Sequence, residues 1–305
     1  MNVFAEYSAF FAVPFLAEAL DASLYVINTG YNNWFESATN VKGIYCGDHT
    51  EKINNDSITI VGYGALTKIK ERIQKHQFER VNFIASDTFF CKNYKWCNMF
   101  IKENNIHFYA MPDLEKFCLI GYKPIYQYVI LNTKLTFPKS SKLLVTHSPG
   151  RKYKSNLKGS NEIKKIVFDL QKKYDFDFKL LSGVSMDDVI REKSKSHIFI
   201  DQLVYKNTNI DQSYWGGKIK YDGGLGKSGL EAMALDTCVI TSGIVPDTKP
   251  YFDSPPITWT SYQTFYEDLE ELILNEGRRN NQIQSQNEWV KNVITNKQFY
   301  KEYLM

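Results

Sequence analysis

Short apolar segments alternate with longer segments of helical periodicity along most of the chain. Brief apolar runs are typical of strands buried on both faces, and amphipathic stretches between them are typical of helices that cover a parallel sheet. This alternation predicts the α/β fold class. The predicted strands are residues 24–27, 58–61, 81–85, 107–111, 143–146, 178–181, 197–200 and 238–241, and the predicted helices are residues 65–76, 94–102, 162–174, 187–193, 227–235, 262–274 and 282–303.

A polar segment separates two such α/β halves. It covers residues 135–142 and contains Pro138, a composition that is typical of a linker. The length of 305 residues is about twice that of a usual single domain, which agrees with two domains that each bury a core. We therefore predict a first domain over residues 1–138, a second over residues 139–281, and a last, mostly polar helix within residues 282–305.

Composition indicates a soluble globular protein. Hydrophobic residues make up 43% and charged residues 23%, and the formal net charge of +3 does not by itself indicate a nucleic-acid partner. The five cysteines form no Cys-x-x-Cys pair. The apolar residues 10–20 are interrupted by Pro14 and Glu18 and lack a basic leader. We expect no disulfide framework, no export signal, no membrane span and a cytoplasmic location.

The most informative segment is residues 221–243, where a glycine-rich loop leads into a helix. Glycines let backbone N–H groups approach a diphosphate closely, and the start of the following helix attracts an anion. Gly226, Lys227 and Ser228 therefore form a candidate phosphate site. Glu231 lies one turn further and could accept hydrogen bonds from two ribose hydroxyls. The alternative is an ordinary amphipathic helix on which Glu231 is a solvated residue.

Three motifs together carry a family resemblance. The first runs from the loop through the helix into the next strand, with Gly226, Leu230, Glu231, Ala232, Met233, Ala234, Val239 and Ile240 in order. The second is His147-Ser148-Pro149-Gly150-Arg151 after a strand, with Lys158-Gly159 before a helix. The third is Ile198-Phe199-Ile200-Asp201-Gln202. Over residues 143–243 this set resembles the donor-binding region of GT-B glycosyltransferases of the retaining, group 1 type.

The resemblance implies a fold and a donor. The fold would be GT-B, with two Rossmann-like domains facing each other across a cleft and a C-terminal helix that packs back toward the first domain. A cap on the second domain is the alternative role of that helix. The donor would be a nucleotide-sugar, a UDP-sugar as first guess, used by a hexosyl- or pentosyltransferase with retention and with no cofactor or metal. The implied donor-binding residues are Ser148, Arg151, Lys158, Gly183, Gly226, Lys227, Ser228 and Glu231.

Because the sequence departs from the family pattern, the identity of the catalytic carboxylate stays open. Retaining members often carry a first glutamate eight positions before the second, and Gly223 occupies that position here. Asp236 stands where glycine is usual, and Cys238 stands where proline is usual. Asp222 could substitute for the missing carboxylate, and Asp201 is a further candidate beside the donor. Lys152 or Lys154 could replace Arg151 or Lys158 as the phosphate ligand.

Weaker signals come from the first half. Ligands of parallel α/β sheets bind at the carboxyl ends of strands. Asp87 is a candidate base or orienting group for the acceptor, with helix capping as the equally ordinary alternative. The other acceptor-side candidates are Tyr7, Ser8, Tyr63, Gly64 and Thr88. The identity of the acceptor stays open: it could be a saccharide, a lipid-linked sugar, a protein or a hydroxylated base in DNA.

Competing motifs are incomplete. Gly226-Lys227-Ser228 resembles the end of a phosphate-binding P-loop, but Tyr221 stands where that motif needs glycine. Asp175 and Asp177 have the spacing of a metal-binding Asp-x-Asp, yet alternate with phenylalanines at a strand start, where a solvated edge is the simpler reading. The second functional hypothesis is a catalytically inactive nucleotide or nucleotide-sugar binding protein, which the missing first carboxylate favours. Neither partner nor oligomeric state is specified further by the sequence.

Overall fold

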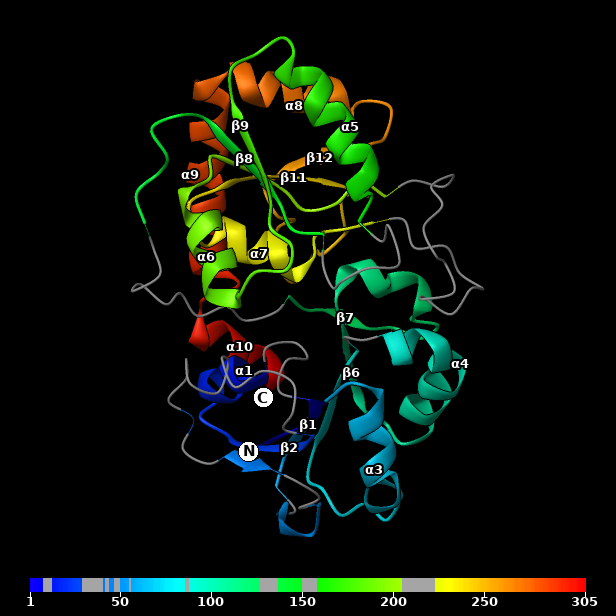
Figure 1. Ribbon diagram of the computed structural model, residues 1–305. Coiled ribbons are helices and arrows are strands. Elements are labelled where there is room, and N and C mark those ends of the chain that lie inside the picture. Colours follow the sequence, from blue (N-terminus) through cyan, green and yellow to red (C-terminus); the bar gives the residue numbers. More distant parts are fainter. Residues whose placement is uncertain are drawn as a thin grey trace. The chain divides into compact units, whose positions relative to one another are not determined.

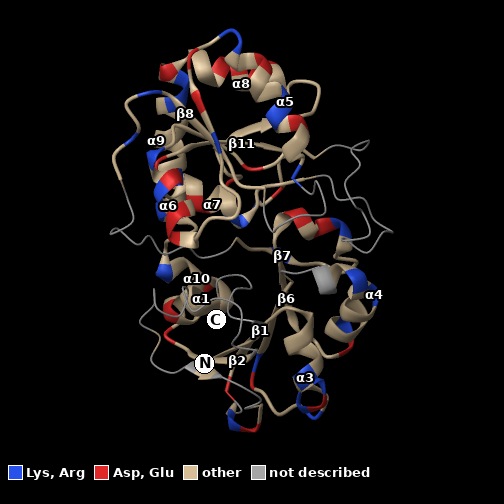
Figure 2. Ribbon diagram, in the orientation of Figure 1, with Lys and Arg blue, Asp and Glu red and all other residues tan. Residues whose placement is uncertain are grey.

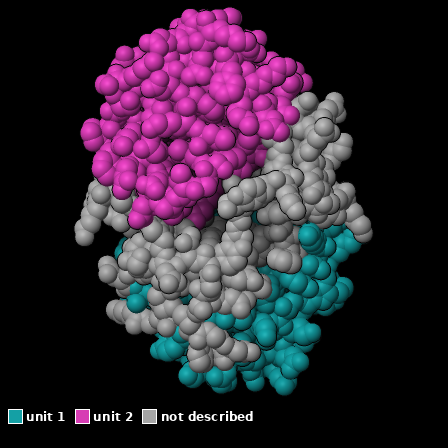
Figure 3. Space-filling model, in the orientation of Figure 1, with its two compact units in different colours: residues 1–130, 293–305 teal, residues 131–292 magenta. Residues whose placement is uncertain are grey.

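The computed structural model describes most of the chain, and that part divides into two compact units. The described residues are 1–7, 13–28, 41, 44–46, 50–54, 56–85, 88–126, 137–149, 158–204 and 223–305. Unit 1 comprises Met1–Ile130 with Val293–Met305, and unit 2 comprises Leu131–Asn292 (Figure 3). Each unit is a parallel β-sheet with helices (Figure 1), so the predicted α/β class is confirmed. Among the described residues, no helix combines the length and the apolar character needed to cross a bilayer.

The sheet of unit 1 has seven strands in the order β3-β2-β1-β4-β5-β6-β7, all paired in parallel. Strands that are buried on both faces explain the uninterrupted apolar runs: all four residues of β4 are buried. The chain passes from β1 outward to β3 and then returns to β4 on the other side of β1, which creates a switch point between β1 and β4. The elements are β1 (Asn2–Tyr7), α1 (Val13–Ala19), β2 (Ser23–Asn28), β3 (Ile44–Cys46), η2 (Thr50–Lys52), β4 (Ile58–Val61), α3 (Tyr63–Gln74), β5 (Val81–Ala85), α4 (Thr88–Glu103), β6 (His107–Ala110), η3 (Pro112–Phe117), β7 (Lys123–Pro124) and α10 (Lys297–Leu304).

The sheet of unit 2 has five parallel strands in the order β12-β11-β10-β8-β9. The chain leaves β8 for β9 at one edge and then crosses to β10 on the opposite side of β8. The carboxyl ends of β8 and β10 therefore flank a switch point, the usual ligand position in open α/β sheets. The elements are β8 (Leu144–His147), α5 (Ser160–Gln171), β9 (Asp177–Leu180), α6 (Met186–Lys195), β10 (Ile198–Ile200), α7 (Lys227–Met233), β11 (Cys238–Ser242), β12 (Thr258–Thr260), α8 (Phe265–Leu274) and α9 (Glu276–Asn292).

The prediction of a single helix over residues 282–303 is wrong, because two helices occupy this region. α9 starts upstream at Glu276 and ends at Asn292, and Gln282 and Gln286 within it hydrogen-bond to the backbone of β11 in unit 2. α10 begins after Asn296, whose side chain accepts a hydrogen bond from the Phe299 amide at 3.0 Å. Asparagine is a strong helix N-cap, and this cap starts a new helix inside the predicted one.

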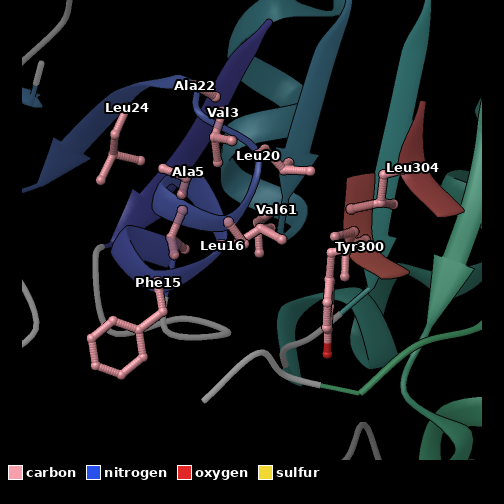
Figure 4. Close-up of a cluster of buried hydrophobic side chains, with 14 of the residues drawn as sticks. Val3, Ala5, Phe15, Leu16, Leu20, Ala22, Leu24, Val61, Tyr300 and Leu304 are labelled. Atoms are coloured by element: carbon pink, nitrogen blue, oxygen red, sulfur yellow. The ribbon is translucent and has the colours of Figure 1, made fainter. Parts of the chain in front are cut away.

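α10 is part of the core of unit 1. Tyr300 and Leu304 are fully buried and belong to the same apolar cluster as residues of β1, α1 and β4 (Figure 4). The Tyr300 hydroxyl donates a hydrogen bond to the Tyr126 carbonyl at 2.6 Å, and the side-chain amide of Asn82 donates to the Leu304 carbonyl at 2.8 Å. Apolar burial and hydrogen bonds thus join the last residues to the sheet formed by the first ones.

We expect Tyr300→Ala to lower the free energy of unfolding by about 3–5 kcal/mol, because a large buried aromatic ring leaves a cavity. Tyr300→Phe removes only the hydroxyl and should cost about 1 kcal/mol. Chemical denaturation followed by circular dichroism measures both. Met305→Ala is the matched control, since that side chain is 62% exposed at the same terminus. Equal stability of Tyr300→Ala and Met305→Ala would contradict a core role for α10.

Candidate functional site

The switch point of unit 2 brings three of the predicted site segments together. β8 ends at His147 and is followed by the buried Ser148, and the neighbouring β10 ends at Ile200 and is followed by Asp201. Lys158 precedes α5, and its ammonium reaches across to Asp201. The predicted donor-side segments at residues 147–148, 158–159 and 198–202 are therefore neighbours in space, as parallel strands require.

Asp201 joins these segments to the glycine-rich loop. Its side chain is fully buried, with Oδ1 2.8 Å from Lys158 Nζ, and its Oδ2 accepts a hydrogen bond from the Gly226 amide at 2.6 Å. A Cβ atom at Gly226 or at Gly229 would lie 3.1 Å from Oδ2, so glycine at both positions leaves the carboxylate room. The sequence predicts Asp201 as a catalytic candidate, but both of its oxygens are engaged beneath the loop, and this geometry indicates a supporting role instead.

Gly159 fixes the position of Lys158 on the other side of Asp201. The backbone of Gly159 has φ 68°, in the left-handed region, and an added Cβ would lie 1.9 Å from the Leu203 carbonyl oxygen. The Leu203 amide in turn donates to the Lys158 carbonyl at 2.9 Å. Only glycine permits this close approach between the start of α5 and the segment after β10.

The first part of the glycine-rich loop is held against the end of β11. The Gly224 amide donates to the Ser242 carbonyl at 2.9 Å, and its carbonyl accepts from Thr241 Oγ1 at 2.9 Å and from the Gln202 side chain. A Cβ at Gly243, which has φ 140°, would lie 2.8 Å from the Gly224 nitrogen. Backbone packs directly on backbone here, and the loop enters α7 in a fixed position.

This packing explains why position 223 carries no carboxylate. A Cβ on Gly223 would lie 2.6 Å from the Ser242 carbonyl oxygen, and the residue has φ 94°, which disfavours a side chain. The family's first glutamate has no equivalent at this position. Asp222, the sequence-based substitute, lies outside the described residues, as do Arg151, Lys152 and Lys154.

Asp236 provides a related departure from the family pattern. It stands where glycine is usual and adopts φ 56°, a left-handed conformation, just past the end of α7. The Asp236 amide donates to the Met233 carbonyl at 3.2 Å, and the Thr237 amide donates to the Ala232 carbonyl at 3.1 Å. These bonds satisfy the last carbonyls of the helix, and aspartate tolerates the left-handed region better than most residues.

Glu231 is buried on α7 and paired with two lysines. Its Oε2 lies 2.6 Å from Nζ of Lys193, which is itself fully buried on α6, and its Oε1 lies 3.8 Å from Lys227 Nζ. The side chain of Glu231 retains 8% exposure. The alternative of a solvated glutamate on an amphipathic helix is therefore wrong, because its carboxylate is embedded in a cluster of cations.

The cations determine the charge state of this cluster. Burial alone would raise the pKa of Glu231, but Lys193 and Lys227 together lower it below its ordinary value. Burial also lowers the pKa of Lys227 to about 8, against an opposing contribution from Glu231. Glu231 is consequently an ionised acceptor at neutral pH, which suits a group that binds hydroxyls.

His147 has a structural role at the end of β8. It is fully buried, and its Nδ1 donates to the Ile200 carbonyl at 2.7 Å. Burial, the largest effect, lowers the pKa of His147 to about 4, so the ring is neutral and Nε2 accepts from the Ser160 hydroxyl at 2.8 Å. Both ring nitrogens are occupied, and the imidazole ties β8 to β10 and to the start of α5.

The remaining predicted residues lie elsewhere. Gly183 is exposed in the turn after the edge strand β9, one strand away from the switch point. In unit 1, Tyr63 and Gly64 begin α3 at the carboxyl end of β4, and the Tyr63 ring lies edge-on to Trp96 at 5.8 Å between ring centres. Tyr7 ends β1 and Thr88 begins α4, with only their backbones described, and Ser8 and Asp87 lie outside the described residues.

Lys193 is the site residue that sequence reasoning missed. Figure 2 shows acidic and basic residues interspersed along α6, which suggests a solvated helix. Yet the buried positions of α6 are Ile190, Lys193 and Ser194, which have helical spacing. A lysine on the buried side of an amphipathic pattern was the available signal, because a buried ammonium requires an acidic partner.

Known structures share the fold of this chain. HepE from Anabaena in complex with UDP aligns at a TM-score of 0.63 with 10% identity, over 100% of this chain and 98% of that chain. A glycosyltransferase from Rickettsia africae aligns at 0.63 with 10% identity over 99% and 97%, and UDP-GlcNAc 2-epimerase from Neisseria meningitidis bound to UDP-GlcNAc aligns at 0.56 with 11% identity over 100% and 99%. No protein-family model and no curated protein sequence matches the chain.

These likenesses define the class of fold. It is the GT-B fold, built from two Rossmann-like α/β domains, and the prediction made from the motifs is confirmed at this level. Within the described residues, no group of three or more histidine, cysteine or acidic side chains is placed to hold a metal ion.

We expect Asp201→Ala to lower the free energy of unfolding by about 3–5 kcal/mol, because it leaves the Lys158 ammonium and the Gly226 amide without their buried acceptor. The loss should appear as a shift of the denaturation midpoint. Asp169→Ala is the matched control, because its pair with Lys172 is exposed and should contribute little to stability. If Asp201→Ala kept normal stability but lost turnover, the carboxylate would instead be catalytic.

Proposed function

We propose that this protein is a glycosyltransferase that moves a sugar from a nucleotide-sugar, with a UDP-sugar as the first choice, to a hydroxyl acceptor with retention of anomeric configuration. The observation that carries the proposal is the ionised, buried Glu231 beside an anchored glycine-rich loop at the switch point of unit 2. HepE, which shares the fold, forms a complex with UDP, and this supports the choice of donor.

The donor contacts follow from charge and geometry. Glu231 would accept hydrogen bonds from the ribose hydroxyls, and the diphosphate would lie near Lys158, Lys227 and the Ser228 amide, with Arg151 as a further cation. Lys158 keeps N–H donors beyond the one directed at Asp201, and its side chain is 20% exposed. Cations and amides at this position would neutralise the charge that develops on the departing diphosphate. The proposal includes no metal or cofactor.

The transferred sugar and its acceptor complete the proposal. Because Gly223 cannot supply a carboxylate, Asp222 is the residue that we propose faces the sugar, a hexose or a pentose. The acceptor would bind at the switch point of unit 1, where Tyr63 and Gly64 begin α3. The other acceptor-side residues that we propose are Tyr7, Ser8, Asp87 and Thr88. We propose Asp87 as the base or orienting group, and a cytoplasmic location for the reaction.

A specific observation favours a second candidate. The tight contact between Gly223 and the Ser242 carbonyl removes the carboxylate position that retaining relatives use. A catalytically inactive nucleotide or nucleotide-sugar binding protein would be the result if Asp222 does not compensate. A hydroxylated base in DNA is the alternative to a saccharide, lipid-linked sugar or protein as acceptor.

A donor and acceptor screen tests the proposal. The protein is incubated with a panel of UDP- and GDP-sugars and with acceptors of each class, products are identified by mass spectrometry, and the anomeric configuration is determined by NMR. A glycosylated acceptor with retained configuration supports the proposal. Binding of donors without turnover supports the inactive binding protein, and conversion of the donor to its 2-epimer would assign the chain to the epimerases of this fold.

We expect Lys158→Met to reduce the affinity for UDP by about tenfold to a hundredfold, because a charged contact to the diphosphate is lost. The affinity for uridine should fall much less than that for UDP, since the nucleoside carries no phosphate and any loss through the Asp201 contact affects both ligands. Calorimetry with both ligands measures the difference. Lys172→Met serves as the control, because Lys172 is 75% exposed and its ion pair with Asp169 lies at the surface. Equal losses for UDP and uridine would remove Lys158 from the diphosphate site.

A further inference from the structure

Lys193 is a cation in the interior of unit 2. Its side chain has 0% exposure, although lysine is among the residues least often fully buried. Nζ donates to Glu231 Oε2 at 2.6 Å and to the Ser228 carbonyl at 3.2 Å, and it lies 4.9 Å from the centre of the Phe199 ring. The ammonium is fully compensated by these partners, all of which belong to α7 or to β10.

Stability alone does not account for this ion pair. Desolvation of two buried charges costs roughly as much as their attraction returns, and well-packed apolar replacements are often neutral or stabilising. The Lys193–Glu231 pair is better explained by an effect of one residue on the function of the other. Glu231 is the member that reaches the surface, with 8% exposure, whereas Lys193 has none.

The geometry shows what Lys193 does to Glu231. One carboxylate oxygen, Oε2, is held by the buried ammonium. The other, Oε1, lies 3.8 Å from Lys227 Nζ, beyond hydrogen-bond distance, and within the described part of the chain no hydrogen bond to it is present. The carboxylate is thereby oriented, with Oε1 left as an acceptor for a ligand.

We propose that Lys193 is a positioning residue for ribose recognition, and that by clamping Oε2 it presents Glu231 to the 2′- and 3′-hydroxyls of the nucleotide. The inference rests on the proposed function, which places the ribose on Glu231. It adds a specificity: the Lys193–Glu231 pair makes the site select ribonucleotides over nucleotides that lack these hydroxyls. An oriented carboxylate gains more from two hydroxyls than a mobile one, because the ordering cost has been met during folding.

Lys139 provides a matched comparison in the same unit. Its Nζ donates to the Ser196 carbonyl at 2.7 Å, to the Leu235 carbonyl at 3.1 Å and to Thr237 Oγ1 at 3.0 Å. It therefore joins the carboxyl ends of α6 and α7, the same two helices that Lys193 connects. A lysine that merely holds these helices together should behave like Lys139.

The test compares two ligands across four proteins. Calorimetry gives the dissociation constants of UDP and of 2′,3′-dideoxy-UDP for the wild type, Glu231→Gln, Lys193→Met and Lys139→Met, and the ratio of the two constants measures what the hydroxyls contribute. We expect the wild type to prefer UDP by about tenfold or more, which corresponds to one or two charge-assisted hydrogen bonds. Glu231→Gln and Lys193→Met should both lose most of this preference, and Lys139→Met should keep it even if its melting temperature falls.

The outcomes separate the inference from the proposed function. If Glu231→Gln keeps the preference, or the wild type has none, the ribose assignment is wrong and the inference falls with it. If Glu231→Gln loses the preference while Lys193→Met keeps it, the ribose assignment stands and Lys193 is not a positioning residue. If Lys139→Met also loses the preference, then any disturbance of the contact between α6 and α7 has this effect. That result would also overturn the inference.

A double variant keeps the test decisive if Lys193→Met does not fold. Lys193→Met/Glu231→Gln removes both buried charges, so neither residue is left as an uncompensated buried ion. Because Lys193 acts through Glu231, the double variant should have the same ligand ratio and the same UDP affinity as Glu231→Gln alone. A further loss of more than about threefold would show an independent contribution of Lys193 and would contradict the inference.

Discussion

A buried carboxylate needs partners for its charge, and at Asp201 this requirement organises the switch point of unit 2. The Lys158 ammonium and the Gly226 amide meet the requirement from opposite sides, so the start of α5 and the start of α7 are both fixed relative to the end of β10. A Cβ at Gly226 or at Gly229 would lie 3.1 Å from Oδ2 of Asp201, so the absence of a side chain at these two positions lets the loop approach the carboxylate closely.

The alternation of apolar and amphipathic segments was sufficient to predict the α/β class, because buried parallel strands and covering helices have distinct periods. β4 and β5 were predicted with the bounds that the structure has. The start of α7 at Lys227 was also predicted, because the preceding glycines interrupt the helical pattern. Local patterns of this kind carry little information about residues distant in sequence. The Lys193–Glu231 pair spans 38 positions, and neither residue alone indicates the other.

The type of a residue predicted its position in the fold better than it predicted its chemical role. Asp201 follows the end of β10, as the sequence pattern indicated, yet the role of its carboxylate depends on contacts with residues such as Gly226, which lies 25 positions later in the chain. His147 illustrates the same limit, since its two hydrogen bonds to Ile200 and Ser160 make a titratable residue into a neutral connection between elements. The division of the last predicted helix depended on a single asparagine cap at Asn296, within a region whose polar composition favours a continuous helix.

Unit 1 is assembled from both ends of this sequence, since Val293–Met305 belongs with Met1–Ile130. During translation the residues of unit 2 are added to the chain before those of α10. The core around Val3, Leu16 and Val61 therefore lacks Tyr300 and Leu304 until the whole of unit 2 has been synthesised. Unit 2, by contrast, is built from one contiguous segment of the chain, Leu131–Asn292. Completion of the core of unit 1 therefore depends on residues that are synthesised after all of unit 2.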